Sequence, residues 1–236
     1  MQGRPQPDKI RIEYRFAFKD GKEKLFEILL DREKLSWSPA SAATLPFWTE
    51  LKFCKCTQCP LAESSCPRCP VAVNLVQIVE AFREVMSHEK VTVTVTTEQR
   101  TFHKDTDIHG GLTPLVGLAM ATSGCPILDY LKPMARFHLP FASIEETLFR
   151  TASMYLVSQY LVKLSGKTPE WDLNGLASIY ASVNQVNQDF FQRLSSAAEK
   201  DANVSALSNL DVFASMALFS LEEAIRSLKP IYQAYL

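Results

Sequence analysis

One short stretch of the chain contains most of the residues that could do specific chemistry. Five of the six cysteines lie between Cys54 and Cys69. Cys56 and Cys59 form one Cys-x-x-Cys pair, Cys66 and Cys69 form a second, and a proline follows each pair. Thiolates at this spacing converge from one tight turn, so two such pairs can surround a tetrahedral zinc ion. The sequence therefore predicts a zinc site with the ligands Cys56, Cys59, Cys66 and Cys69, and with Cys54 as a spare ligand.

Two other interpretations of these cysteines stay open. An iron–sulfur cluster is the alternative cofactor for the same ligands, although their spacing departs from the ferredoxin pattern. Reduced cysteines without a metal are the third interpretation, because the six residues between the two pairs are fewer than in a common zinc ribbon. Four sulfurs close the coordination sphere and leave no position for a substrate. We therefore expect a structural site that joins neighbouring elements.

The sixth cysteine, Cys125, is a candidate for chemistry of another kind. It precedes Pro126, at the expected N-terminus of a short helix, where the helix dipole and free N–H groups lower a thiol pKa. His109 and His138 are near it in sequence, and a Cys–His pair can act as a nucleophile or a redox centre. Cys125, His109 and His138 are therefore the candidate catalytic residues. The alternatives are a second metal site made of the same three residues and a buried, inert cysteine.

Basic residues close to this cysteine suggest an anion site. Arg136, His138 and Arg150 could bind a carboxylate or a phosphate in a pocket beside it. The Gly110-Gly111 pair could also cradle an anion, but no strand–turn–helix fingerprint accompanies it. No motif supports either idea, so both are hypotheses about single residues.

Composition excludes several classes of partner. The chain has 236 residues, 47% of them hydrophobic and 22% charged, which is enough for a globular core without disulfide staples. The net charge of −1 and the absence of basic runs argue against nucleic acid or an anionic membrane as a partner. The most apolar stretch, residues 112–120, is too short to span a bilayer. We expect a cytoplasmic protein, whose clustered cysteines are metal ligands or redox groups.

The first part of the chain predicts strands and one helix. Residues 10–18 alternate apolar and charged side chains, Asp20-Gly21 favours a hairpin turn, and residues 24–30 form the returning strand. Further strands are expected at 47–53 and at 91–97, the latter reaching as far as residue 102. Residues 71–86 have the apolar spacing of a helix.

The rest of the chain predicts helices. They are expected at 112–120, 126–134, 143–163, 173–198 and 204–219, with a last helix that Pro230 ends. Capping boxes at Ser143 and Ser220 mark two of the helix starts, and the second predicts a kink in the chain. The sequence therefore predicts an α+β fold in which a small antiparallel sheet of about four strands, with the cysteine knuckle at its edge, packs on a C-terminal helical bundle. Residues 1–104 form the β-rich part and 105–236 the helical part, within one globular unit.

Two further stretches carry a family resemblance. The run from His109-Gly-Gly to Phe137-His-Leu-Pro-Phe141, with the Cys-x-x-Cys-Pro loop, resembles a family of bacterial proteins of unknown function and similar length. The resemblance implies a bacterial cytosolic protein and supplies no catalytic residues.

The function expected from the residues is that of a metal-stabilised module that binds a protein partner or a small ligand. The alternative is a thiol-dependent or iron–sulfur redox enzyme that uses Cys125. The amphipathic C-terminal helices could also form a homo-oligomer, although such faces more often pack in a core.

Overall fold

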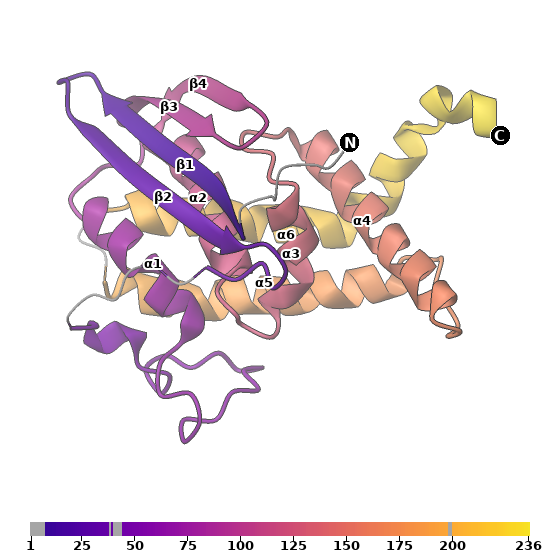
Figure 1. The fold of residues 1–236 in the computed structure, drawn as a ribbon, viewed down its shortest axis with the longest axis horizontal. Helices are drawn as coiled ribbons and strands as arrows, with labels where there is room; N and C mark the ends of the chain where they lie inside the picture. The colour runs from indigo at the N-terminus through magenta and orange to yellow at the C-terminus, as the bar shows by residue number, and fades with distance from the viewer. Residues whose placement is uncertain (1–7, 38, 40–43, 198–199) are drawn as a thin grey trace.

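The computed structural model describes residues 8–37, 39, 44–197 and 200–236. They form an antiparallel sheet with helices packed against it, so the predicted α+β class is confirmed. Figure 1 shows the sheet across the upper left of the molecule and the helices below it. The strands are β1 (Lys9–Phe18), β2 (Glu23–Asp31), β3 (Lys90–Thr96) and β4 (Thr101–Asp107), in the order β2-β1-β3-β4.

The alternating sequence of β1 places one set of its side chains in the core. Ile12, Tyr14 and Phe16 are buried, whereas the charged residues between them are exposed or half-buried. Tyr14 stands opposite Phe26 of β2 and Val95 of β3. Residues directly opposite each other share a face of the sheet, so the three strands bury one continuous apolar surface.

The prediction of a strand at residues 47–53 is wrong. Phe47–Thr49 forms the short 3-10 helix η1, and Glu50 pairs with Arg68 in an isolated bridge. The fourth strand of the sheet is β4, which lies at an edge and keeps most of its side chains exposed. An edge strand that buries little surface does not require alternating apolar and polar residues. The sequence of β4 therefore lacks the pattern by which a strand is usually predicted.

The helices follow most of the predicted ranges. They are α1 (Pro70–Ala81), α2 (Ile108–Ala121), η2 (Leu128–Leu131), α3 (Lys132–Arg136), α4 (Ile144–Leu164), α5 (Asn174–Ser195), α6 (Ala202–Ser227) and η3 (Lys229–Tyr235). α2 begins four residues earlier than predicted, because the Asp107 carboxylate accepts a hydrogen bond from Gly110 N at 2.9 Å and caps it. α4 begins with the predicted capping box at Ser143. The predicted end of the fifth helix, residue 198, lies outside the described residues.

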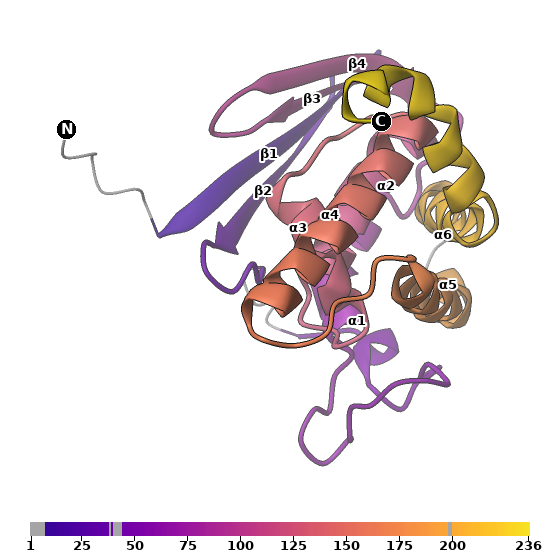
Figure 2. The same cartoon turned by 90° about the vertical axis from the view of Figure 1, so that its right-hand side faces the viewer.

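The elements are arranged in layers. Figure 2 shows α2 between the sheet and the α5–α6 pair, with α4 beside it. α2 approaches the sheet closely at Gly111, where an added Cβ would lie 2.6 Å from Val93 Cγ2. The segment between η1 and α1, which contains five cysteines, projects from the body next to α1 (Figure 1).

The last long helix is bent. The axes of Ala202–Ala217 and Leu221–Ser227 differ by 69°, which agrees with the predicted kink at Ser220. Over the described residues, no single helix is long and apolar enough to cross a membrane, although the two arms of α6 pass that test when they are taken together.

Candidate functional site

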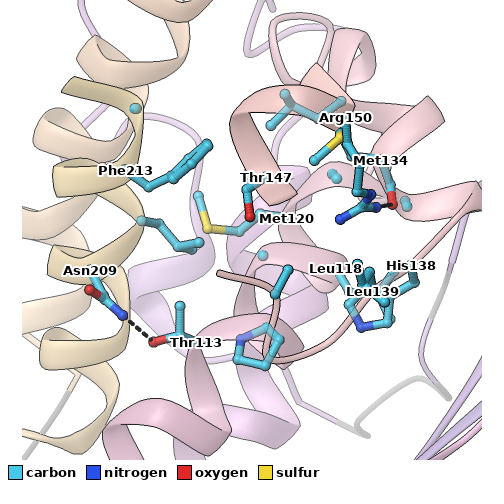
Figure 3. Close-up of a pocket in the computed structure, with 18 of the residues that line it drawn as sticks. Thr113, Leu118, Met120, Met134, His138, Leu139, Thr147, Arg150, Asn209 and Phe213 are labelled. Atoms are coloured by element: carbon cyan, nitrogen blue, oxygen red, sulfur yellow. Dashed lines mark hydrogen bonds between the residues drawn. The ribbon is translucent and has the colours of Figure 1, made fainter. Parts of the chain in front are cut away.

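A cavity of about 390 Å³ opens between the helices. Its walls come from α2 to α6, from η2 and from the segment that joins α3 to α4, and Lys104 of β4 contributes at one side. Figure 3 shows Leu118, Met120, Met134 and Phe213 around it, so much of the lining is apolar. Volumes of about 300–1,000 Å³ with a mainly apolar lining are typical of small-molecule sites.

The charges in the lining have one sign. Lys104 and Arg150 line the cavity, and the described residues contribute no aspartate or glutamate to it. Arg150 Nη2 donates to the carbonyl oxygens of Phe137 at 2.6 Å and of Met134 at 3.3 Å. Within the part of the chain that the structure describes, no carboxylate lies at ion-pair distance from Arg150. Burial lowers the pKa of Arg150, and its guanidinium is a half-buried positive charge beside apolar walls.

His138 also lines the cavity, and its environment keeps it neutral. Its Nε2 lies 2.5 Å from the hydroxyl oxygen of Tyr14, a buried residue of β1. Burial, and then the charge of Arg150, lower the pKa of His138 to about 3. Burial raises the pKa of Tyr14 well above its ordinary value. The pair is therefore uncharged near neutral pH, and it joins the sheet to the segment before α4.

Two of the three basic residues predicted to bind an anion line the cavity, but Cys125 does not. His138 and Arg150 both line the cavity, but Arg136 and Cys125 are not among the lining residues. The Arg136 guanidinium lies 5.4 Å from the ring centre of Phe137 instead. Gly110 lines the cavity and its N–H donates to the Asp107 cap, whereas Gly111 packs against Val93 of the sheet.

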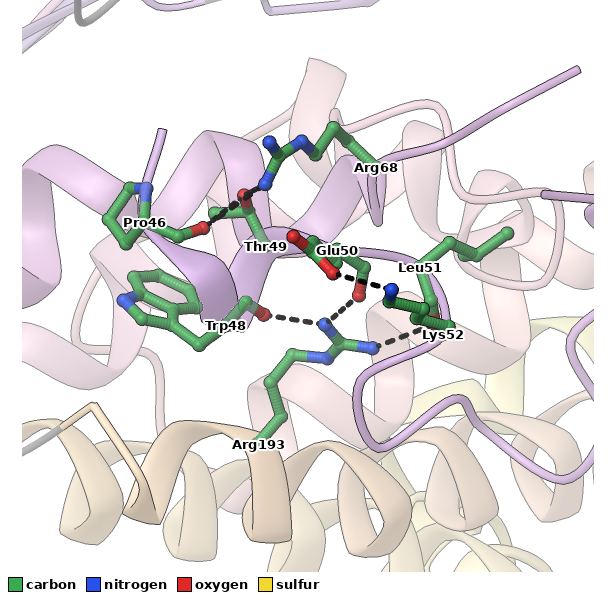
Figure 4. A network of polar contacts seen from close by, with 8 residues as sticks. All are labelled: Pro46, Trp48, Thr49, Glu50, Leu51, Lys52, Arg68 and Arg193. Atoms are coloured by element: carbon green, nitrogen blue, oxygen red, sulfur yellow. Dashed lines mark hydrogen bonds and ion pairs between the residues drawn. The ribbon is translucent and has the colours of Figure 1, made fainter. Parts of the chain in front are cut away.

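The cysteine-rich loop is anchored on α5 by one buried side chain. Arg193 is 1% exposed, and its guanidinium donates to the carbonyl oxygens of Trp48, Glu50, Leu51 and Cys54 at 2.5–3.3 Å. Figure 4 shows the guanidinium surrounded by this turn of the chain. No carboxylate among the described residues forms an ion pair with it. Arg193 therefore holds the start of the loop through main-chain carbonyl groups.

A second contact from α5 holds the loop further along. The Asp189 carboxylate accepts hydrogen bonds from Thr57 N at 2.7 Å and from Thr57 Oγ1 at 2.8 Å. At the other end of the loop, Cys69 N donates to Thr49 O at 2.8 Å. The loop is consequently tied to α5 and to η1 even though it projects from the body.

The cysteine knuckle predicted at the sheet edge is not formed in the structure. Over the described residues, no group of three or more His, Cys, Asp or Glu side chains is placed to hold a metal ion as it stands. Cys66 Sγ donates to Arg68 O at 3.1 Å, and Cys54 is exposed. The loop also packs against η1, α1 and α5, because the expected strand before it does not exist. Zinc and iron–sulfur binding both stay predictions.

The three candidate catalytic residues have separate surroundings. His109 Nδ1 lies 2.6 Å from Ser205 Oγ, and His138 binds Tyr14. Burial raises the pKa of Cys125, more than the N–H groups of Leu128 and Ile127 lower it, whereas an activated thiol needs the opposite direction. The Cys69 and Cys59 thiols also raise the pKa of Cys125. The catalytic role of these residues stays a prediction that no contact between them supports.

Two residues of these sites, Arg193 and Lys104, were not predicted from the sequence. Arg193 follows Phe190 by three residues on the apolar face of α5. A charged residue on a face that is otherwise apolar could have indicated a buried, hydrogen-bonded side chain. Lys104 stands opposite Val93 on the inner face of the sheet, but this position can be recognised only when β4 and its register are known.

Fold and site together define an α+β domain with a positively charged cavity among its helices and a cysteine-rich loop anchored on α5. The chain belongs to the family described as a domain of unknown function (DUF6901), whose model matches residues 12–233. This confirms the resemblance to a family of unknown function. No curated protein and no solved structure matches the chain.

Proposed function

We propose that this domain is a metal-stabilised module that binds a small apolar molecule with a carboxylate group in the cavity between its helices. The observation that carries the proposal is Arg150, a guanidinium without a carboxylate partner among the described residues, at the wall of a mainly apolar cavity. Guanidinium groups bind carboxylates through paired, charge-assisted hydrogen bonds. A ligand carboxylate would supply the counter-charge that the described lining lacks.

The rest of the lining suits the apolar part of such a ligand. Met120 and Met134 have flexible side chains that adapt to irregular shapes, and Phe213 offers a flat apolar surface. His138 is neutral near pH 7 and adds no second charge. Lys104 of β4 also lines the cavity and adds to its positive potential. These features favour one anionic group on an aliphatic or aromatic body.

The metal part of the proposal rests on the spacing of the cysteines. Four thiolates favour zinc, and the free energy of binding adds to the free energy of folding. Its role would be to hold the loop in place.

Calorimetric titration with octanoate and 1-octanol tests the ligand class, because the two probes share an apolar chain and differ in the head group. We expect wild-type protein to bind octanoate more tightly than 1-octanol. Arg150→Gln should weaken octanoate binding about 10–100-fold, since a hydrogen bond to a charged group contributes about 1.5–3 kcal/mol, and leave 1-octanol binding unchanged. Arg136→Gln is the matched control and should bind octanoate like wild type, because Arg136 does not line the cavity.

A second measurement covers the case in which Arg150→Gln fails to fold. In methyl NMR spectra of the wild-type protein, octanoate should shift the signals of Met120, Met134 and Leu118, which line the cavity. Absence of octanoate binding, shifts confined to other parts of the chain, or equal affinity in Arg150→Gln would each overturn the proposal.

A further inference from the structure

One buried polar side chain in the cavity wall has no partner in the protein. Asn187 of α5 lines the cavity and is 3% exposed. Within the part of the chain that the structure describes, its side-chain amide forms no hydrogen bond. The amide is also not among the described polar groups that are sealed away from any probe, so it is open to the cavity. Because buried amides are as a rule hydrogen-bonded, a partner for Asn187 has to come from the cavity side.

The other uncharged polar side chains in the described lining are used by the fold. Each of them hydrogen-bonds to another protein group, and Figure 3 shows one such contact, from Asn209 Nδ2 to Thr113 Oγ1 at 3.4 Å. The residues are Thr113, His138, Ser143, Thr147, Tyr180 and Asn209. The Asn187 amide thus differs from them in that its hydrogen-bonding capacity is left for a ligand.

A second asparagine in the same helix shows what a structural amide looks like here. Asn184 Nδ2 donates to Asp211 Oδ1 at 2.8 Å and to Ser215 Oγ at 2.9 Å, and its Oδ1 accepts from Gln188 Nε2 at 2.9 Å. These bonds hold α5 to α6. Asn187, one turn later, contributes nothing of this kind, and an apolar residue in its place would avoid the cost of burying an unpaired amide. Its polarity is therefore explained better by a ligand than by folding.

The helix fixes how far this amide lies from the charged part of the cavity. Tyr180 and Asn187 both line the cavity from α5, two turns apart, which is about 10 Å along the helix axis. The hydroxyl groups of Tyr180 and Thr151 lie 3.0 Å apart, and Thr151 follows Arg150 in α4. Tyr180 therefore marks the level of Arg150 on α5. A ligand whose carboxylate binds Arg150 would reach Asn187 with a group about 10 Å away along its body.

We propose that Asn187 binds a hydroxyl group of the ligand, so that the cavity takes an apolar carboxylic acid with a hydroxyl at its far end. This inference rests on the proposed function, because it takes the carboxylate at Arg150 as given. An amide both donates and accepts, and so does a hydroxyl, which matches it in either orientation. In the free protein a water molecule can serve the amide. A ligand hydroxyl reproduces the hydrogen bonds of that water, whereas a methyl group does not.

Calorimetric titration with octanoate and 8-hydroxyoctanoate tests this assignment, because the two probes differ only in the terminal hydroxyl. Wild-type protein should bind 8-hydroxyoctanoate about 3–10-fold more tightly than octanoate. Asn187→Leu, which has nearly the same shape without the amide, should lose this preference and bind octanoate at least as tightly as wild type does. Asn209→Leu is the matched control and should keep the preference, since the Asn209 amide already donates to Thr113.

A measurement on wild-type protein covers the case in which Asn187→Leu fails to fold. In ¹⁵N spectra of the side-chain amides, 8-hydroxyoctanoate should shift the Asn187 signals more than octanoate does. The Asn184 signals are the internal reference and should respond alike to both probes, because that amide is bonded to α6.

The outcomes separate this inference from the proposed function. Equal affinity of wild type for the two probes, a preference that survives in Asn187→Leu, or one that is lost only in Asn209→Leu would overturn the role of Asn187. Octanoate binding that depends on Arg150 would still stand in each of these cases. If neither probe bound to the wild-type protein, the carboxylate site and the hydroxyl site would both be refuted.

Discussion

Arg193 Nη1 lies 2.5 Å from the carbonyl oxygen of Trp48, and 145 positions separate the two residues in the sequence. The contact connects α5 to the turn that precedes the cysteine-rich loop. It makes the loop's position dependent on a helix from the other half of the chain. The stability of the fold should therefore be sensitive to this one side chain.

Arg193→Met should destabilise the protein by at least about 3 kcal/mol. The substitution keeps much of the apolar stem but leaves four carbonyl oxygens without their donor, and each buried unsatisfied group costs about 1–3 kcal/mol. Urea unfolding of the two proteins measures the difference. The control is Arg226→Met, which removes an exposed pair with Glu222 and should cost less than about 0.5 kcal/mol. Equal effects of the two substitutions would contradict the anchoring role.

His138 should make the stability depend on pH below neutrality. Its pKa is lowered from 6.5 to about 3 in the folded protein, so between these values the unfolded chain binds more protons. Stability from this group is thus complete above pH 6.5 and declines as pH falls toward 3, by up to about 1.4 kcal/mol per pH unit. His138→Phe removes the titrating group.

The free energy of unfolding of wild type and His138→Phe, measured from pH 7 to pH 4, checks this expectation. Wild type should lose about 2–4 kcal/mol more than the variant over that range. Parallel pH profiles would mean that His138 is not held neutral by the fold.

Gly111 and Gly117 lie in the same helix but should respond differently to alanine. An alanine Cβ at position 111 would lie 2.6 Å from Val93 Cγ2 and 3.1 Å from Phe16 Cε1, so we expect a loss of about 1–3 kcal/mol. At position 117 the nearest atom is Leu210 Cδ2 at 3.3 Å, the end of a flexible side chain. There the helix propensity of alanine, worth about 1 kcal/mol, should offset the crowding.

Thermal unfolding of Gly111→Ala and Gly117→Ala distinguishes the two positions. A loss of 1 kcal/mol lowers the Tm of a domain of this size by roughly 2–4 °C. Gly111→Ala should therefore melt several degrees below wild type, and Gly117→Ala close to it. A Gly111→Ala variant as stable as wild type would refute close packing of α2 on the sheet.

The capping box of α4 offers a local test. Ser143 Oγ accepts from Glu146 N at 3.1 Å, and the Glu146 carboxylate accepts from Ser143 N at 2.7 Å. Ser143→Ala should cost about 1 kcal/mol in chemical unfolding. Ser143→Asp keeps an acceptor at the N-cap and should retain most of the wild-type stability. If both variants lost the same amount, the cap would not be the cause.

The strands that bury one face were predictable from the sequence, and the edge strand was not. β1 and β3 alternate apolar and polar residues, because each has one face in the core. β4 lacks this pattern because it lies at the edge of the sheet. The apolar residues between 47 and 53 include Trp48 and Leu51, which are buried in the core although this stretch is not a strand. Burial alone does not reveal whether a short apolar run is extended or folded into a turn.

The candidate cavity could be foreseen only in part. Arg150 and His138 were recognisable as basic residues near each other in sequence. The neutral state of His138 depends on its burial and on the charge of Arg150, and both depend on the fold. The contacts of the two residues with Tyr14 and with the carbonyl of Phe137 likewise form only in the folded chain.

The sequence by itself determined that the chain forms strands followed by helices, and that its cysteines are concentrated in one loop, because hydrophobic periodicity and residue spacing are local properties. Only the tertiary structure decided which elements hold that loop. The Asn74 side chain joins α1 to the end of α2, and the Arg193 anchor on α5 holds the start of the loop. Contacts of this kind depend on how helices pack, since packing joins residues whose separation in sequence carries no information about their distance.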